Sequence, residues 1–311
     1  MHDASPISPE ERAGHGNPQA LAALSLPRRA WEIVRRVVVG VYADGFIHAG
    51  NLAYLALVSL FPFFIATAAL AHGLGRGADT TMAVDSFLRE LPKSVRELLR
   101  QPITDVLAQR TGSLLWLGGL LGLWTTGSFI ETIRDILRRA YGTQSTKSFW
   151  RYRIGSTVLI MGAVVATLIA FSLQLLLTGV EEFVARLLPV SDEVIGWIGW
   201  SRLAPAVALF GALYLIFFSL TPSRYREVGC LKWPGAMFTA LWWVLATTAL
   251  PAVLAQLGGY DRTYGSLAGV IVALLFFWLV GFGLVIGAHL NAALAETPSS
   301  AIRGPHQPAE G

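Results

Sequence analysis

Charged residues and cysteines are scarce in this chain of 311 residues. Asp, Glu, Lys and Arg make up 14% of it, against roughly 25% in a typical soluble domain. The single cysteine, Cys230, excludes an internal disulfide and a zinc cluster built on several cysteines. The sequence also lacks a nucleotide-binding Gly-rich loop, a His-Glu-x-x-His pair and a Gly-x-Ser-x-Gly turn. These absences argue against a soluble enzyme and against ATP-driven transport, and they predict no catalytic residue, no cofactor and no metal site.

The chain instead contains several long runs of apolar residues. Hydrophobic residues make up 54% of the chain, and the mean hydropathy is +0.54. A helix needs about 20 apolar residues to cross a bilayer, and no soluble core would use so many runs of that length. We therefore predict an all-α fold, a polytopic membrane helix bundle with about six transmembrane helices. The predicted spans are residues 46–70, 113–130, 154–180, 203–220, 233–257 and 264–294.

The segments outside these spans predict three further features. Residues 1–27 and 296–311, rich in Ala, Pro, Gly and Ser, are predicted to be disordered tails around a membrane domain at 28–295. Basic and apolar residues mix over 28–42, which predicts an amphipathic helix on the inner leaflet. Residues 80–110 predict short amphipathic helices on the outer side, divided at Pro92 and Pro102. Charged residues at helical spacing over 131–141 predict that the second span continues as a helix beyond the membrane.

The distribution of Lys and Arg predicts the orientation. With the N-terminus inside, 15 of these residues fall in inner segments and 9 in outer ones, and positive charge is retained on the cytoplasmic side. We expect an inner (plasma) membrane protein of a bacterium, with both termini in the cytoplasm. The net charge of +4 then indicates contact with anionic membrane lipids and not with nucleic acid. The sequence does not indicate the oligomeric state.

Five short motifs follow one another along the chain. They are Asp44-Gly45-Phe46 with Ala53-Tyr54 and Ser59-Leu60-Phe61-Pro62; Arg138-Arg139-Ala140-Tyr141-Gly142; Pro234-Gly235-Ala236; Tyr264-Gly265-Ser266-Leu267-Ala268; and Gly287-Ala288-His289-Leu290-Asn291-Ala292. In this order and spacing they resemble the YihY/BrkB family of bacterial inner-membrane proteins. The resemblance covers about residues 37–295, nearly all of the predicted membrane domain.

The resemblance implies a six-helix inner-membrane protein that affects envelope properties such as serum resistance and the handling of envelope lipids. It also implies that the ribonuclease label once given to the family is mistaken, so we do not expect an enzyme. This chain departs from the family pattern in two places. His289 stands where relatives usually have Glu, and Asn51 stands where they have small residues. If that Glu carries protons in relatives, either His289 replaces it or the role is absent here.

Polar side chains inside spans are costly and are therefore candidate functional residues. Asn51, Tyr54 and Ser59 could form a polar stripe that faces a cavity shared with the last span, beside a carbonyl freed at Pro62. The alternative is that such groups hold neighbouring helices together through hydrogen bonds. His289 could also lie at the level of the headgroups, where a polar residue costs little. The predicted substrate-binding residues are Asn51, Tyr54, Ser59, Pro62, Gln174, Tyr264, His289 and Asn291.

Arginines near the end of the second span form the other candidate site. Arg134 and Arg138 share a helix face and Arg139 flanks it, and Arg can hold two phosphate oxygens at once. We predict an anionic lipid headgroup site there, with a simple topology anchor paired to Glu131 and Asp135 as the alternative.

Three functions are compatible with these features. The favoured one is transport or handling of an amphipathic or lipidic envelope component through a cavity between the helices, without ATP. The alternative is a structural membrane protein that supports envelope assembly. A ribonuclease-type enzyme is the least favoured, because the acidic residues are scattered and the six His are isolated from one another.

Overall fold

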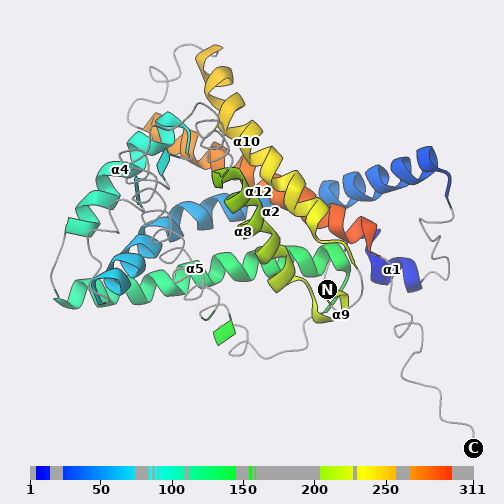
Figure 1. The fold of residues 1–311 in the computed structure, drawn as a ribbon, viewed down its shortest axis with the longest axis horizontal. Helices are drawn as coiled ribbons and strands as arrows, with labels where there is room; N and C mark the ends of the chain where they lie inside the picture. The colour runs from blue at the N-terminus through cyan, green and yellow to red at the C-terminus, as the bar shows by residue number, and fades with distance from the viewer. Residues whose placement is uncertain are drawn as a thin grey trace, which may run out of the picture.

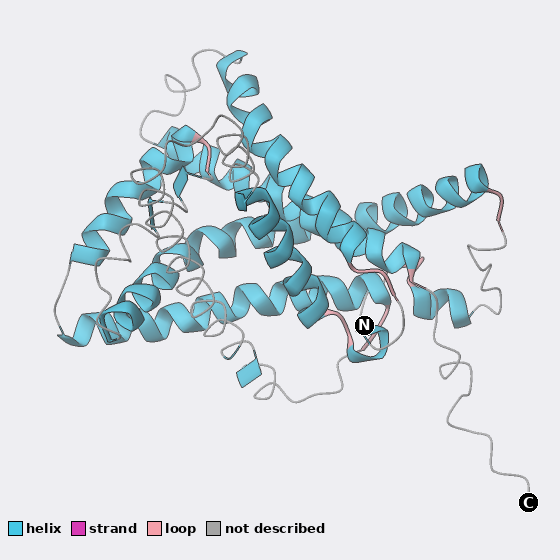
Figure 2. Cartoon of the chain, viewed as in Figure 1, coloured by secondary structure: helices cyan, strands magenta, loops and turns pink. Residues whose placement is uncertain are grey.

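The computed structural model describes residues 5–14, 24–73, 84–85, 88–89, 91–108, 112–144, 154–155, 158, 204–226, 230–256 and 267–295. Every regular element in these residues is a helix, as Figures 1 and 2 show, and this confirms the all-α class. Most of the predicted span at 154–180 lies outside the described residues, so the number of spans stays a prediction. Gln174, Tyr264 and the tail at 296–311 also lie outside them.

Helix α12 (Ala268–Leu294) is the centre of the bundle. It packs against α2 (Leu26–Gly73), α10 (Trp233–Gln256) and α5 (Gly112–Tyr141), while α8 (Ala204–Leu220) lies against α10 (Figure 1). Many buried residues of α12 are Gly or Ala, and small side chains let helix backbones approach closely. The composition of α12 thus explains its central place.

Helices α10 and α12 cross closely. A Cβ atom added to Gly235 would lie 2.3 Å from the carbonyl oxygen of Gly287, and one added to Gly283 would lie 2.2 Å from the Trp242 ring. Thr239 Oγ1 donates to the carbonyl oxygen of Gly283 across the crossing, at 3.2 Å. The Gly283-x-x-x-Gly287 spacing is therefore a helix-packing motif.

Helix α2 is continuous over 48 residues. The prediction of a separate short helix at 28–42 before the first span is wrong, because both segments belong to this one helix, which also continues through Pro62. Gly40 does not interrupt it: a Cβ atom there would lie 2.4 Å from Nδ1 of His289 on α12. The glycine that weakens the helix locally is the residue that lets α2 and α12 pack.

Helix α4 (Lys93–Ala108) forms a second amphipathic layer against α2 and α12. Its buried face includes Val95, Leu99 and Ile103. The helix begins directly after Pro92 but continues through Pro102, so the predicted division at Pro102 is wrong. A proline inside a helix costs about 3 kcal/mol, whereas each fully buried Val, Leu or Ile side chain contributes roughly 1.5–3 kcal/mol, so packing outweighs the lost hydrogen bond.

The outward faces of α8 and α10 are apolar. Val207, Leu215, Leu241, Leu245 and Val253 are each more than half exposed. Among the described helices, α10 and α12 are long and apolar enough to cross a membrane. Large apolar side chains on the outer surface are unfavourable in water but suit contact with lipid.

The N-terminal segment contains a short helix within residues 1–27, for which the sequence predicts a disordered tail. Helix α1 (Pro9–Gly14) starts at Ser8, whose Oγ accepts a hydrogen bond from the backbone N–H of Glu11 at 3.2 Å. Ser at the N-cap, Pro in the first helical position and acidic residues next are strong helix-start signals. The prediction for residues 1–27 rested on their average composition, which does not reflect this local signal. Figure 1 shows α1 beside the C-terminal end of α12.

Candidate functional site

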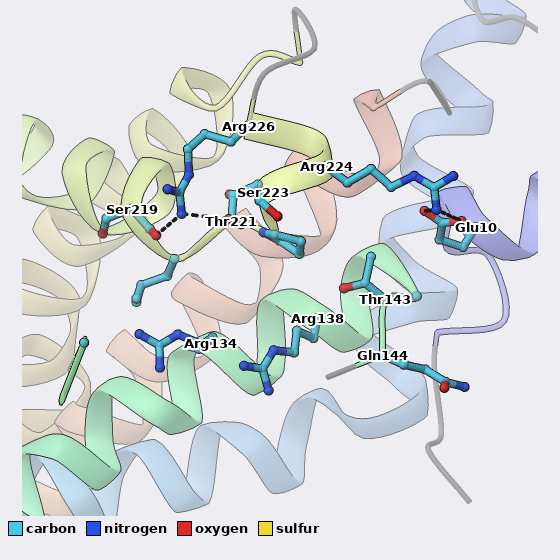
Figure 3. Close-up of a pocket in the computed structure, with 14 residues that line it drawn as sticks. Glu10, Arg134, Arg138, Thr143, Gln144, Ser219, Thr221, Ser223, Arg224 and Arg226 are labelled. Carbon is cyan, nitrogen blue, oxygen red and sulfur yellow. Dashed lines mark hydrogen bonds and ion pairs between the residues drawn. The ribbon is translucent and has the colours of Figure 1, made fainter. Parts of the chain in front are cut away.

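A basic pocket lies where the C-terminal end of α5, the turn between α8 and α9 (Ser223–Arg226), and α1 meet (Figure 3). Its volume is about 580 Å³. Four arginines and one glutamate supply its charged groups, and hydroxyl and amide side chains complete the lining. The lining residues are Glu10, Arg134, Arg138, Gly142, Thr143, Gln144, Gly155, Ser219, Leu220, Thr221, Pro222, Ser223, Arg224 and Arg226.

Helix α5 supplies one wall. Arg134 and Arg138 are one turn apart, so both side chains leave the same helix face, as Figure 3 shows. The helix ends at Tyr141, and the next residue, Gly142, has a φ of 76°. The N–H of Thr143 donates to the carbonyl of Arg138 at 2.9 Å, and the N–H of Gly142 donates to that of Arg139 at 3.2 Å. This Schellman turn satisfies the last carbonyls of the helix and brings Thr143 to the pocket rim.

The α8–α9 turn supplies the opposite wall. Pro222 follows the end of α8, and Thr221 Oγ1 donates to the carbonyl of Phe217 at 2.5 Å. Arg226 donates to the carbonyls of Ser219 and Thr221. A basic side chain at a helix C-terminus satisfies free carbonyls and interacts favourably with the helix dipole. Arg226 therefore stabilises the turn while its charge remains part of the pocket.

Glu10 reaches the pocket from α1. Its Oε1 lies 3.0 Å from Nη1 of Arg224, and it accepts a hydrogen bond from the Tyr225 hydroxyl at 2.7 Å. Burial, followed by the hydrogen bond to Glu10, raises the pKa of Tyr225 well above its usual range, so the phenol remains a donor. The partly exposed ion pair is worth about 0–1 kcal/mol, and the hydrogen bond to a charged acceptor about 1.5–3 kcal/mol. The buried phenol is thus the stronger anchor.

Arg12 holds the other end of α1. Its guanidinium donates to the carbonyl oxygens of Ala295 at 2.8 Å and Ala292 at 3.4 Å, both at the C-terminal end of α12. Burial, with a smaller contribution from Arg36, lowers the pKa of Arg12 to about 10, so it stays charged at neutral pH. The backbone N–H of Ser5 donates to the carbonyl of Arg139 at 3.0 Å. Residues 5–14 therefore join the ends of α5 and α12 beside the pocket.

This arrangement suits the binding of an anion. Arginine forks can hold two oxygens of a phosphate at once, and the rim adds hydroxyl donors. The hydroxyl oxygen of Thr143 is buried and has no hydrogen-bond partner among the described residues. Across the described parts of the chain, no three His, Cys, Asp or Glu side chains are grouped as a metal site would require.

Comparison with known proteins agrees with the motifs. Residues 42–310 match the family described as Virulence factor BrkB. The chain belongs to this family. It is similar to YfkH of Bacillus subtilis, whose name describes it as ribonuclease-like, with 29% identity over 81% of this chain and 90% of YfkH. It is also similar to a UPF0761 membrane protein of Vibrio vulnificus, with 24% identity over 88% of this chain and 86% of the relative. No solved structure matches.

The resemblance to the BrkB family is thereby confirmed, and the chain is a membrane protein. A UPF0761 membrane protein of Pseudoalteromonas translucida is 23% identical over 80% of this chain and 81% of the relative. The names of the two UPF0761 relatives state no substrate, so the function of this BrkB chain has to be argued from its own residues.

The predicted polar stripe lies away from this pocket. Asn51 is exposed, Tyr54 is 59% exposed, and buried Ser59 donates to the carbonyl of Ala56 in its own helix at 3.2 Å. The structure describes only the backbone of Pro62, which is helical. None of these residues lines the pocket, and their role in substrate binding stays a prediction.

His289 and Asn291 are both buried in α12. Oδ1 of Asn291 accepts from the N–H of Gly235 at 2.8 Å, and Nδ2 donates to the carbonyl of Lys232 at 3.0 Å. The side chain thus caps the first turn of α10 from another helix. This geometry favours the structural alternative for Asn291. His289 lies at the close approach of Gly40, and its part in function stays a prediction.

The predicted arginine cluster is only partly assembled at the pocket. Arg134 and Arg138 line it, but Arg139 is outside the lining and its Nε pairs with Asp135 Oδ2 at 2.8 Å. Glu10, Arg224 and Arg226 line the pocket but were not among the predicted site residues. The helix-start signal at Ser8 could have revealed α1, whereas nothing in the sequence indicates that Glu10 meets a residue 214 positions away.

Proposed function

We propose that this BrkB-family membrane protein binds the anionic headgroup of an amphipathic envelope lipid in the arginine pocket and transports or handles that lipid without ATP. The observation that carries the proposal is the gathering of four arginines at one end of an apolar helix bundle. A headgroup seated there would leave its acyl chains free to lie along the exposed apolar faces of the neighbouring helices.

The pocket is proposed to face the cytoplasm, at the inner leaflet of the inner membrane. The excess of Lys and Arg on that side of the chain supports this orientation. Arg134, Arg138, Arg224 and Arg226 are themselves part of that excess. Anionic lipid of the inner leaflet would then reach the arginines without crossing the bilayer.

Arginine chemistry separates a specific site from a general anchor. Attraction to an anionic leaflet is worth about 1 kcal/mol for each basic residue and does not depend on the shape of the cation. A bidentate contact to phosphate requires the planar guanidinium and is lost with lysine. Arg134 and Arg138 are the residues whose shape should matter.

The test is to replace Arg134 by Lys and by Ala in the full chain and to measure retained anionic lipid by native mass spectrometry. We expect Arg134→Lys to weaken retention about tenfold, which corresponds to about 1.4 kcal/mol. Arg35→Lys is the matched control, because Arg35 is 59% exposed and pairs with Glu32 in its own helix. If Arg134→Lys retains lipid like the wild type while Arg134→Ala fails, the arginines are only an electrostatic anchor.

We also propose that the protein is not an enzyme and has no nucleic acid partner. The pocket lining contains one carboxylate and no His, and hydrolysis of RNA by general acid–base or metal catalysis requires more groups of these kinds. The ribonuclease-like name is that of YfkH, and it does not by itself assign an activity to this chain. RNA cleavage by the purified chain that Arg134→Ala abolishes would contradict this proposal.

A further inference from the structure

We infer that Glu10 is a specificity-determining residue of the arginine pocket, whose charge lowers the preference of the pocket for doubly charged phosphates relative to a singly charged phosphodiester. The inference rests on the proposed anion binding and adds the chemical class of the ligand. It starts from an unusual feature: a carboxylate from the N-terminal helix lies among four arginines.

The carboxylate is held from two directions. Nη1 of Arg224 lies 3.0 Å from Oε1 and 3.1 Å from Oε2, and the Tyr225 hydroxyl donates to Oε1 at 2.7 Å. The Tyr225 side chain is fully buried, with its ring centroid 4.8 Å from that of Tyr141. Because the phenol cannot move freely, it fixes the position of the carboxylate.

The helix that carries Glu10 is fixed on both sides of it. Ser5 is tied to the carbonyl of Arg139 on α5, and Arg12 to the carbonyl of Ala295 beyond α12. Gly142 lies against Ser8, since a Cβ atom there would approach Ser8 Oγ to 2.2 Å. A ligand therefore meets the carboxylate in place and does not simply push α1 aside.

A fixed negative charge penalises ligands in proportion to their own charge. Repulsion between two like unit charges near contact lowers the affinity for a ligand by roughly fivefold in a water-like medium, and by more in a less polar medium. A phosphodiester carries one negative charge, whereas a phosphomonoester carries about 1.5–2 at neutral pH. Glu10 therefore lowers affinity for both classes but lowers it most for phosphomonoesters and inorganic phosphate.

The negative charge of Glu10 also limits which phosphate compounds the pocket can bind. Arg134, Arg138 and Arg226 without Glu10 would form a general phosphate site, open to any soluble phosphate on that side of the membrane. With Glu10 present, the pocket retains enough positive charge for a monoanion. Glu10 thus shifts the selectivity of the pocket toward a phosphodiester headgroup and away from a phosphomonoester one.

The experiment uses the full chain in nanodiscs and compares Glu10→Gln with the wild type. The lipid probes are phosphatidylglycerol and phosphatidic acid, and the soluble probes are dimethyl phosphate and inorganic phosphate. We expect Glu10→Gln to raise the affinity for phosphatidic acid and inorganic phosphate about fivefold more than for the two phosphodiesters. Glu11→Gln is the matched control. It removes the same charge from the neighbouring residue, whose side chain is not part of the pocket lining, and it should leave the ratio of the affinities unchanged.

A second variant separates charge from the docking of α1. Tyr225→Phe removes the hydrogen bond to Glu10 but keeps the carboxylate and its ion pair with Arg224, so it should preserve most of the discrimination as long as α1 stays docked. Hydrogen exchange of residues 5–14 reports the docking directly. Tighter binding of phosphatidylglycerol than of dimethyl phosphate identifies a lipid headgroup, and equal binding identifies a free phosphodiester; in both cases the Glu10→Gln comparison decides the charge selectivity.

The inference is overturned if Glu10→Gln raises the affinity for all four probes equally, or if Glu11→Gln shifts the ratio as much. The proposed function fails separately, if Arg134→Ala leaves the binding of every probe unchanged. In that case the pocket binds no anion, whatever Glu10 does.

Discussion

Replacing Asn291 by Ala is the sharpest test of how the bundle is held together. The Asn291 side chain has no exposed surface, and it joins α12 to the backbone of Lys232 and Gly235 at the start of α10. The first N–H groups of a helix have no partner within the helix, so another group must satisfy them. Asn291 supplies that group from a different part of the chain.

The expected loss follows from the two hydrogen bonds. The carbonyl of Lys232 keeps a weak contact from the N–H of Ala236 at 3.5 Å, so the greater loss falls on the N–H of Gly235. A buried group left without a partner costs about 1–3 kcal/mol. We therefore expect Asn291→Ala to lower the free energy of unfolding by about 2–4 kcal/mol.

Two measurements in detergent report this change. Fluorescence of the ten Trp residues follows thermal unfolding, and maleimide labelling of the single Cys230 follows local opening next to Lys232. Labelling should be at least about tenfold faster in Asn291→Ala, since 1.4 kcal/mol corresponds to a factor of ten. Asn51→Ala is the control, because this amide is exposed, and exposed substitutions usually change stability by about 0.5 kcal/mol or less.

Two outcomes would refute the reasoning. If Asn291→Ala unfolds and labels like the wild type, the capping bonds do not stabilise α10. If it loses lipid retention with unchanged labelling, Asn291 acts on a substrate, as the sequence had suggested, and not on the helix.

Two further predictions concern packing and orientation. Gly287→Ala should lower the free energy of unfolding by about 1–3 kcal/mol, because its Cβ would lie 2.7 Å from the carbonyl of Gly235; Gly50→Ala, with no atom within 4 Å of its Cβ, should be neutral or slightly stabilising in the same denaturation assay. Reporter fusions after Gly142 should signal the cytoplasm and fusions near Asp192 the outer side, and the reverse pattern would disprove the orientation and the proposed inner-leaflet site.

Much of the fold could be predicted from the sequence. The continuation of the second span to Tyr141 is confirmed by α5, because charged pairs three and four residues apart are local to one helix. The amphipathic face of α4 is likewise confirmed, since its periodicity is a property of a short segment. The end predicted at Pro102 was wrong because the burial of Leu99 and Ile103 outweighs the local cost of the proline.

The sequence by itself determined the helical class, the membrane character and the family, because hydrophobic length, local periodicity and short motifs are written in neighbouring residues. Only the tertiary structure decided which polar groups meet. Glu10 and Arg224 are 214 positions apart, and Asn291 and Gly235 are 56 apart. No periodicity encodes such pairs, because they form only when close crossings of α12 with α2 and α10, made by small residues, bring the ends of separate helices together.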